Sequence, residues 1–297
     1  MKKLTLAIKK YGLIYMMVLP AVILYSIFVI YPMIKGLHVS FYRWDGLSEM
    51  EWIGIKNYKF VFKDEIFWSA MKNTLLFAFV VSIAKNVIAL FLALLLNRNI
   101  KFRTFFRTST FLPVTLAFVV AGMLWSWMYN PIFGLINNFL TLVHLESLIQ
   151  GWLSDPKIAL WSIMFVDIWK WVGFHMVLFL TGIQAIPEEL YEAARIDGAG
   201  RWHCFFHVTI PLVMQVTIVS FLLSITGAFV SNYDLVYVMT GGGPFHSTEV
   251  ALTWIVSTTT RYAAVGKGNA MSMIMFVIVL VFGVLQMYFS QKNSYEM

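Results

Sequence analysis

The chain has 297 residues, a length at which a water-soluble protein would usually form two domains. However, 60% of its residues are hydrophobic and only 12% are charged, which is far outside the composition of a soluble globular protein. The net charge of +7 comes from basic residues that stand between long apolar runs, a pattern that argues against nucleic-acid binding and for membrane topology. The single cysteine, Cys204, excludes an internal disulfide and leaves too few thiols for a structural metal site.

The N-terminus combines basic residues with an apolar run, as a signal peptide does. The run from Gly12 to Ile30 contains no charged residue, and no small-residue cleavage site follows it. We therefore predict an uncleaved first transmembrane helix.

Six apolar segments are long enough to cross a bilayer, because a helix that rises about 1.5 Å per residue needs about 20 residues for a hydrocarbon core of about 30 Å. Backbone groups in lipid must bond within their own segment, so these segments are predicted to be helices. The predicted spans are residues 12–30, 74–96, 108–128, 158–186, 212–233 and 270–289. Short helices at the interface or packed on the bundle are expected within 132–142 and 250–256.

Two dense basic clusters lie on one side of the membrane if the helices alternate in direction. Cytoplasmic loops are enriched in Lys and Arg near helix ends, so this side is predicted to be the cytoplasm. The N-terminus, the C-terminus and the loop 187–211 then lie inside. The clusters are Lys2, Lys3, Lys9 and Lys10 before the first span, and Arg98, Lys101, Arg103 and Arg107 between the second and third.

The loop 187–211 is predicted to form a helix, a turn and a second helix. Pro187 is tolerated in a first helical turn, and the acids after it suit the positive end of a helix. Gly198 permits the turn. The small pair Ala193-Ala194 would let the groove of another protein approach the backbone, although a capped polar connection is the plainer alternative.

A family resemblance begins in this loop. Glu192-Ala193-Ala194, then Gly198 six residues after the glutamate, then Val208-Thr209-Ile210-Pro211, is similar to the signature of binding-protein-dependent ABC permeases, written EAA, three residues, G, nine residues, I-x-L-P. The last four residues depart from it conservatively. Further matches point to the carbohydrate branch of the maltose and glycerol-phosphate type. They include Gly54-Ile55-Lys56-Asn57-Tyr58, Asn130-Pro131 and Thr240-Gly241-Gly242-Gly243-Pro244.

The resemblance implies one permease domain over residues 1–297, with six transmembrane helices and a cytoplasmic coupling helix, the type I ABC importer fold. It implies a multi-pass protein of the bacterial or archaeal cell membrane that imports a mono- or oligosaccharide or a derivative. The expected partners are a second permease, usually a different chain, two ATP-binding subunits and an extracytoplasmic solute-binding protein. This chain would bind no cofactor, because ATP and Mg²⁺ would be used by the partner ATPases. The positions that match the coupling motif are Glu192, Ala193, Ala194, Asp197 and Gly198.

Three charged residues, Lys85, Asp167 and Lys170, lie inside predicted spans, where a charge costs about 2.5–3.5 kcal/mol. Asp167 and Lys170 are three residues apart on one helix face, so a mutual ion pair is one interpretation. The other is that Lys170, with Trp171 and Phe174, lines the translocation pathway, because aromatic faces stack on sugar rings and a cation suits an acidic group.

On the predicted fifth span, Ser224, Ala228 and Ser231 share one face. Small residues there either permit close helix contact or leave room for substrate, and the resemblance implies that this helix contributes to a sugar pocket.

No catalytic or metal-binding motif is present: there is no HExxH, no nucleophile elbow, and no Lys-Ser/Thr pair after the Gly241–Pro244 turn. We therefore predict that the chain is not an enzyme. An ABC permease for another solute, a secondary transporter and a membrane-embedded enzyme remain as alternatives, although a secondary transporter would ordinarily need more spans or an inverted repeat.

Overall fold

A computed structural model describes residues 15–294, with the side chains of residues 230, 231 and 285–294 outside the description. Within these residues the structure is almost entirely helical, and the two strands have two residues each. This confirms the predicted all-α class. The chain divides into two compact units, which we describe separately: a hairpin unit of residues 15–64 and 255–277, and a bundle unit of residues 65–254 and 278–294. That residues 1–297 act as one permease domain stays a prediction.

Among residues 15–294, four helices are long and apolar enough to cross a membrane, and two bent helix pairs raise the number to six if each pair is one span. The four are Tyr15–Val39, α4 (Glu65–Asn97), α8 (Ala159–Gln184) and residues 265–284 of α14 (Val265–Ser294). The first helix includes a π-helical turn, η1 (Ser26–Ile30), and ends in α2 (Tyr31–Val39). It therefore continues beyond the predicted end at Ile30, while residues 12–14 of the prediction lie outside the described part.

The third predicted span, 108–128, is not a single straight helix. It consists of α5 (Arg103–Phe111), the 3-10 turn η2 (Leu112–Thr115) and α6 (Phe118–Met128), and the two halves meet at 104°. Pro113 has no backbone N–H to donate, and Leu116 and Ala117 have extended backbone angles. The break leaves backbone carbonyls that need partners from elsewhere.

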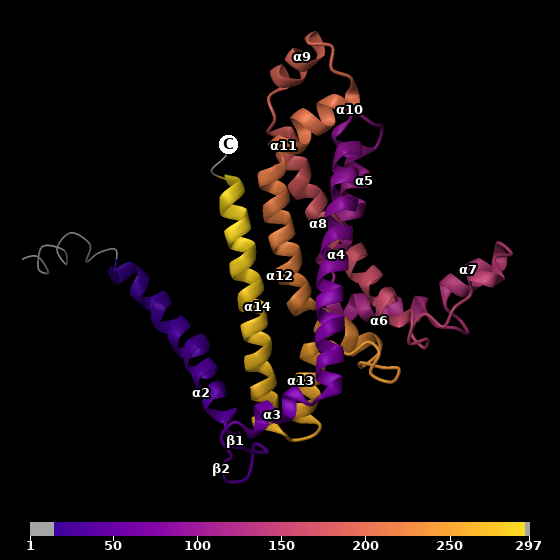
Figure 1. Cartoon of the computed structure of the whole chain (residues 1–297). Coiled ribbons are helices and arrows are strands. Elements are labelled where there is room, and N and C mark those ends of the chain that lie inside the picture. Colours follow the sequence, from indigo (N-terminus) through magenta and orange to yellow (C-terminus); the bar gives the residue numbers. More distant parts are fainter. Residues whose placement is uncertain (1–14, 295–297) are drawn as a thin grey trace, which may run out of the picture. The chain divides into compact units, whose positions relative to one another are not determined.

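The core of the bundle unit lies where α4, α8 and α12 (Met214–Met239) pack side by side (Figure 1). Ala89 and Ala93 are fully buried on α4, and their small side chains let α8 approach closely. Between α8 and α12, a Cβ added at Gly182 would lie 2.7 Å from a Val216 methyl group, so glycine sets this spacing. The buried core residues are Ala89, Ala93, Leu96, Val172, Met176, Phe179, Leu180, Ile183 and Val213.

The segment between α8 and α12 forms the predicted helix, turn and helix. It contains α9 (Glu188–Ile196), α10 (Arg201–Cys204), the π-helical turn η4 (Phe205–Thr209) and α11 (Ile210–Leu212). These elements lie at one end of the bundle (Figure 1). The chain bends by 63° between Leu212 and Met214 before α12 begins.

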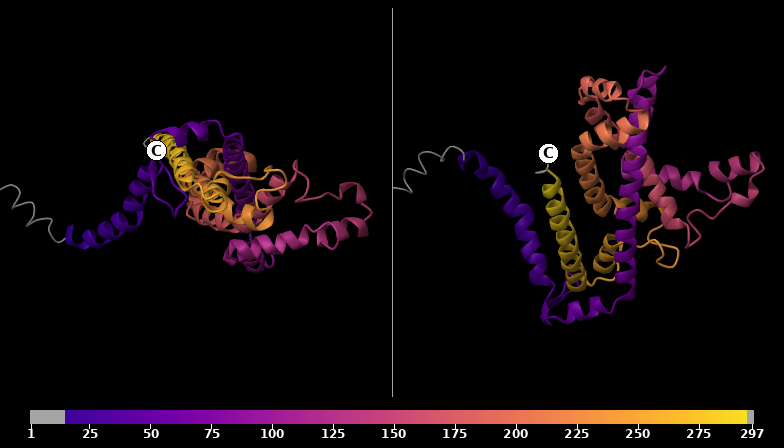
Figure 2. Two further views of the ribbon diagram at one scale, coloured as in Figure 1. Left: turned by 90° about the horizontal axis from the view of Figure 1, so that it is seen from below. Right: turned by 45° about the horizontal axis from the view of Figure 1, so that its top comes forward.

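Two more helices confirm the short helices expected outside the spans. They are α7 (Leu135–Leu142), which is followed by the 3-10 turn η3 (Glu146–Leu148), and α13 (Ala251–Thr260). Both views in Figure 2 show α7 projecting away from α4, α8 and α12. Only Asn137 of α7 is buried, and its side chain accepts a hydrogen bond from Trp152 Nε1 at 2.8 Å.

The hairpin unit contains β1 (Tyr42–Arg43) and β2 (Glu51–Trp52), which pair antiparallel, and α3 (Lys56–Phe62). The buried side chain of Asn57 donates to the carbonyls of Ser40 and Tyr42 at 2.8 Å each. Lys267, at the start of α14, forms a salt bridge of 2.7 Å with Asp64. These contacts attach α3 and the start of α14 to the strands.

Candidate coupling and translocation sites

The coupling motif lies on α9, with its small residues accessible. Glu192 and Ala193 are exposed and Ala194 is half-buried. Glu188 and Glu189 occupy the first turn and Arg195 the last, the order that a helix dipole favours. The sequence predicted this helix and its acidic start correctly.

Asp197 caps the C-terminus of α9, and Gly198 makes the turn after it. Gly198 has φ +83°, a left-handed conformation that side chains rarely adopt, and nothing lies within 4 Å of a Cβ placed there. Its requirement for glycine is therefore conformational and not steric. The amide of Ala199 donates to Ala194 O at 2.9 Å, which closes the turn.

One side-chain hydrogen bond joins α9 to the helical segment before α12. The Tyr191 hydroxyl lies 3.0 Å from Thr209 Oγ1, and Thr209 is 5% exposed. This contact therefore links α9 directly to η4, in addition to the connecting backbone. The motif signature does not include Tyr191, so sequence reasoning missed it.

Lys170 is buried against the break between α5 and α6. Its ammonium group donates to the carbonyls of Leu116 at 2.6 Å, Val114 at 3.1 Å and Pro113 at 3.4 Å. It also lies 4.8 Å from the centroid of the Phe118 ring. A single lysine on α8 thus supplies donors for the carbonyls that the broken span exposes.

Asp167 forms its salt bridge with Lys85 of α4, whereas one interpretation of the sequence gave Lys170 as its ion-pair partner. Lys85 Nζ lies 2.8 Å from Asp167 Oδ2, and the two side chains are 3% and 0% exposed. The pair joins α4 to α8 across 82 residues of sequence. Local spacing favoured the i,i+3 partner because it could not reveal a neighbour on another helix.

Trp171 and Phe174 are both half-buried and follow Lys170 along α8. Their rings meet edge to face, with centroids 5.8 Å apart, and Lys170 Nζ lies 5.2 Å from the Trp171 ring. The structure therefore brings the three predicted residues of α8 together, with the lysine as the most buried member.

Ser224 takes part in a buried polar network that the sequence did not indicate. Its hydroxyl lies 3.2 Å from His175 Nε2, and the other ring nitrogen of His175 lies 2.8 Å from Ser220 Oγ. Asn86 of α4 donates to Ser224 Oγ at 3.4 Å. Ala228 is fully buried one turn further along α12, and the side chain of Ser231 lies outside the description.

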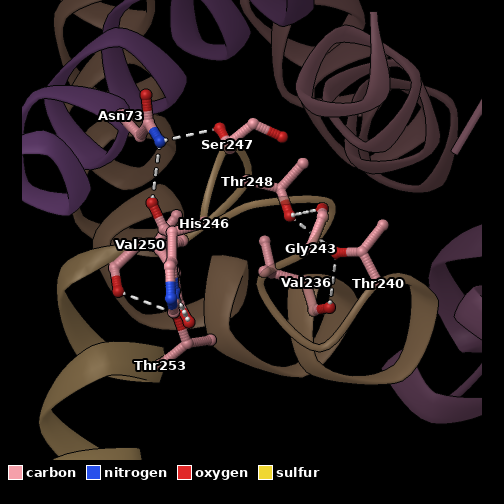
Figure 3. A network of polar contacts seen from close by, with 10 residues as sticks. Asn73, Val236, Thr240, Gly243, His246, Ser247, Thr248, Val250 and Thr253 are labelled. Atoms are coloured by element: carbon pink, nitrogen blue, oxygen red, sulfur yellow. Dashed lines mark hydrogen bonds and ion pairs between the residues drawn. The ribbon is translucent and has the colours of Figure 1, made fainter. Parts of the chain in front are cut away.

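The glycine-rich turn after α12, residues 240–249, is held by one side chain distant in sequence and by one of its own (Figure 3). The amide of Asn73 on α4 donates to the carbonyls of Ser247 at 3.0 Å and Glu249 at 2.9 Å. Thr248 Oγ1 donates to Gly243 O at 2.6 Å. The Asn73 bonds attach the turn to the first part of α4, and the Thr248 bond closes the turn itself. The glycine-rich sequence after α12 therefore has a structural role.

Glu249 is the buried acid of this turn. It is 3% exposed, accepts a hydrogen bond from Thr253, and lies 3.4 Å from His246 Nδ1. Its carboxylate occupies the space that a Cβ on Gly242 would need, and Gly242 has φ +90°. Glycine at this position is thus required by both backbone angle and space.

Apolar spans surround the buried Lys85–Asp167 pair, and a helix with exposed small residues lies at the end of the bundle, which is the arrangement of a membrane transport subunit. Residues 85–295 match the family of binding-protein-dependent transport system inner membrane components, and the chain belongs to that family. It is an inner membrane component.

Two named relatives match almost the whole chain. The probable ABC transporter permease protein YurN of Bacillus subtilis is 35% identical over 285 residues, which cover 95% of this chain and 97% of YurN. The trehalose/maltose transport system permease protein MalF of Thermococcus litoralis is 33% identical over 272 residues, covering 91% of each. A chain of a bacterial ABC transporter for the acidic polysaccharide alginate has a TM-score of 0.85 and 26% identity, covering 98% of this chain and 99% of that one. The type I ABC importer permease fold predicted from the sequence is confirmed.

Proposed function

We propose that this chain is the membrane-spanning permease of an ABC importer for a carbohydrate, whether a mono- or oligosaccharide or a derivative. The observation that carries the proposal is α9, which presents Glu192, Ala193 and Ala194 at the end of an apolar bundle. The sugar class is supported by relatives named for trehalose, maltose and alginate import.

The proposed assembly contains a second permease, two ATP-binding subunits and an external solute-binding protein. The solved alginate ABC transporter in complex with a periplasmic protein that carries an alginate pentasaccharide supports the solute-binding partner. ATP and Mg²⁺ are used by the partner ATPases, and this chain binds neither. The chain itself catalyses no reaction in this proposal.

The proposed orientation places both termini and the loop 187–211 in the cytoplasm. The distribution of Lys and Arg supports it, because four basic residues lie within ten residues of sequence directly after α4, in the connection to α5 and in α5 itself: Arg98, Lys101, Arg103 and Arg107. The glycine-rich turn and α7 then lie outside.

In the proposed mechanism, Ala193, Ala194 and Glu192 contact a cleft of the ATPase, while Asp197 and Gly198 form the turn that fixes the direction of α9. ATP binding moves the two ATPases together and α9 with them. Because the Tyr191 hydroxyl contacts Thr209, the displacement reaches α12 as well as α8. The helices around the pathway then reorient and open it to the other side.

The proposed pathway residues are Trp171 and Phe174 on α8, with Ser224, Ala228 and Ser231 on α12. The half-buried aromatic pair offers faces that can stack on a sugar ring. Lys170 holds the break between α5 and α6, so in this proposal it supports the fold beside the pathway and does not act on the solute.

Replacing Ala193 by leucine tests the docking of α9. The side chain is exposed, so the larger residue should leave the fold intact while it prevents close approach by the ATPase. We expect loss of ATPase subunits from the purified complex and loss of hydrolysis stimulated by the ligand-loaded binding protein. Ala185→Leu, at an exposed position outside α9, is the matched control. Normal ATPase retention and normal uptake in Ala193→Leu would contradict the proposal.

A further inference from the structure

The coupling segment is the part of the chain from α9 to α11, residues 188–212. A cavity of about 1190 Å³ lies in the bundle unit between this segment and the ends of α4 and α8. One wall comes from the last two turns of α4, including Phe91 and Leu95, and from Ile183 of α8. The opposite wall comes from α9 and α10, including Tyr191 and Trp202. Figure 1 shows α9 and α10 at one end of the bundle.

The lining of this cavity is strongly positive. Arg98, Arg195 and Arg201 line it, and Glu188 is the one carboxylate among the described residues that do. Guanidinium groups keep their charge at every physiological pH. Within residues 15–294, none of these arginines has a carboxylate within salt-bridge distance. Three guanidinium groups are therefore available to an anion.

The α4 wall of the cavity is apolar and belongs to a membrane-spanning helix. Phe91 is 60% exposed and Leu95 is 38% exposed. At the end of the same helix, the Arg107 guanidinium donates to Leu96 O at 2.7 Å, which compensates the negative end of α4. Arg107, and not Arg98, therefore caps the C-terminus of α4. Arg98 lines the cavity together with the apolar side chains of Phe91 and Leu95.

We propose that this cavity binds the headgroup of an anionic phospholipid from the cytoplasmic leaflet, with its acyl chains against Phe91 and Leu95. The planar guanidinium groups of Arg98, Arg195 and Arg201 match phosphate oxygens in geometry and charge. A free phosphate compound would satisfy the charge but would leave the apolar α4 wall in water. A lipid satisfies both, and basic pockets at the cytoplasmic ends of spans are suited to acidic headgroups.

The bound lipid would connect α4 to the coupling segment. Arg195 is in the last turn of α9 and Arg201 begins α10, whereas Arg98 directly follows α4. One headgroup contacting all three would hold the coupling segment against the span ends. This inference rests on the proposed orientation, in which α9 is cytoplasmic.

The test measures lipid retention by the full transporter, purified in neutral detergent and titrated with phosphatidylglycerol or with phosphatidylcholine, using native mass spectrometry. The variant Arg195→Gln/Arg201→Gln removes two charges from the cavity. Lys101→Gln/Arg103→Gln removes two charges near the start of α5 without changing the cavity lining, and is the matched control. A third arm adds inorganic phosphate in excess over the lipid.

We expect the wild-type complex and the control to retain phosphatidylglycerol in preference to phosphatidylcholine. The cavity variant should bind it about thirtyfold more weakly, because each basic residue near an anionic lipid contributes about a fivefold effect. Equal weakening in the control, or none in the cavity variant, would overturn the proposal. Displacement of the lipid by inorganic phosphate would also overturn it and would indicate a site for soluble anions.

ATPase stimulation by the ligand-loaded binding protein is measured on the same samples. Normal stimulation without selective lipid retention refutes the lipid site alone, whereas absence of stimulation in the wild type refutes the proposed function. A labelling experiment that placed residues 187–211 outside the cell would overturn both.

Discussion

Replacing Lys170 by methionine tests whether this residue supports the backbone of the broken third span. Methionine has an unbranched apolar side chain but no hydrogen-bond donor to offer. The bond to Leu116 O at 2.6 Å is short and the bond to Val114 O at 3.1 Å has an ordinary length, whereas the one to Pro113 O at 3.4 Å is long. Two effective bonds are therefore lost.

The free-energy change is the difference between two opposing effects. Hydrogen bonds from a charged group contribute about 1.5–3 kcal/mol each, so two of them contribute about 4.5 kcal/mol at mid-range. Methionine also removes a charge whose placement in a span costs about 3 kcal/mol. The net destabilisation is about 1.5 kcal/mol, which lowers the ratio of folded to unfolded chain about tenfold.

The assay compares the amount of assembled complex in membranes with the initial uptake rate per complex. We expect Lys170→Met to lower the amount and to leave uptake per complex close to that of the wild type. Lys72→Met, which changes an exposed lysine on α4, should alter neither quantity. A normal amount of complex with reduced uptake per complex would refute this reasoning, and would show that Lys170 acts on the solute.

Three further predictions concern the coupling turn and the buried pairs. Gly198→Val should uncouple ATP hydrolysis from uptake more severely than Gly198→Asn, because the positive φ of residue 198 is less accessible to a β-branched residue than to asparagine. Equal uptake by both variants would argue against conformational strain. Single substitutions Lys85→Met and Asp167→Asn should each cost about 3–5 kcal/mol, because each removes one partner of a buried salt bridge. The double variant should lose less than the sum, as a double-mutant cycle of unfolding would show. Tyr191→Phe should lower the amount of solute taken up per ATP hydrolysed, since the hydrogen bond to Thr209 Oγ1 is lost while the ring is kept. An unchanged ratio of uptake to hydrolysis would mean that the backbone alone transmits the motion of α9.

Much of the helical content follows from segment length and composition. A run such as 74–96 can satisfy its backbone in lipid only as a helix, and α4 contains that whole run. The coupling helix also follows from local features, since Pro187, the acids after it and Gly198 each favour a particular position in or beside a helix. Local chemistry was sufficient in both cases.

The break in the third span shows where local reasoning fails. Pro113 was visible in the sequence, but a proline within an apolar run is compatible with a kink or with a full break. The outcome depends on whether another helix supplies donors, and here Lys170 of α8 does. The same limit hid the pairing of Lys85 with Asp167, because 82 residues separate them.

The dependence of α5 and α6 on Lys170 also has a consequence for how the protein is made. Lys170 lies 54 residues after Leu116, so the ribosome completes the bent segment well before it adds the residue that satisfies its carbonyls. During that interval we expect the segment to keep access to water or to the insertion machinery. Release into lipid would follow only when α8 arrives, so that the order of translation also sets the order of membrane integration.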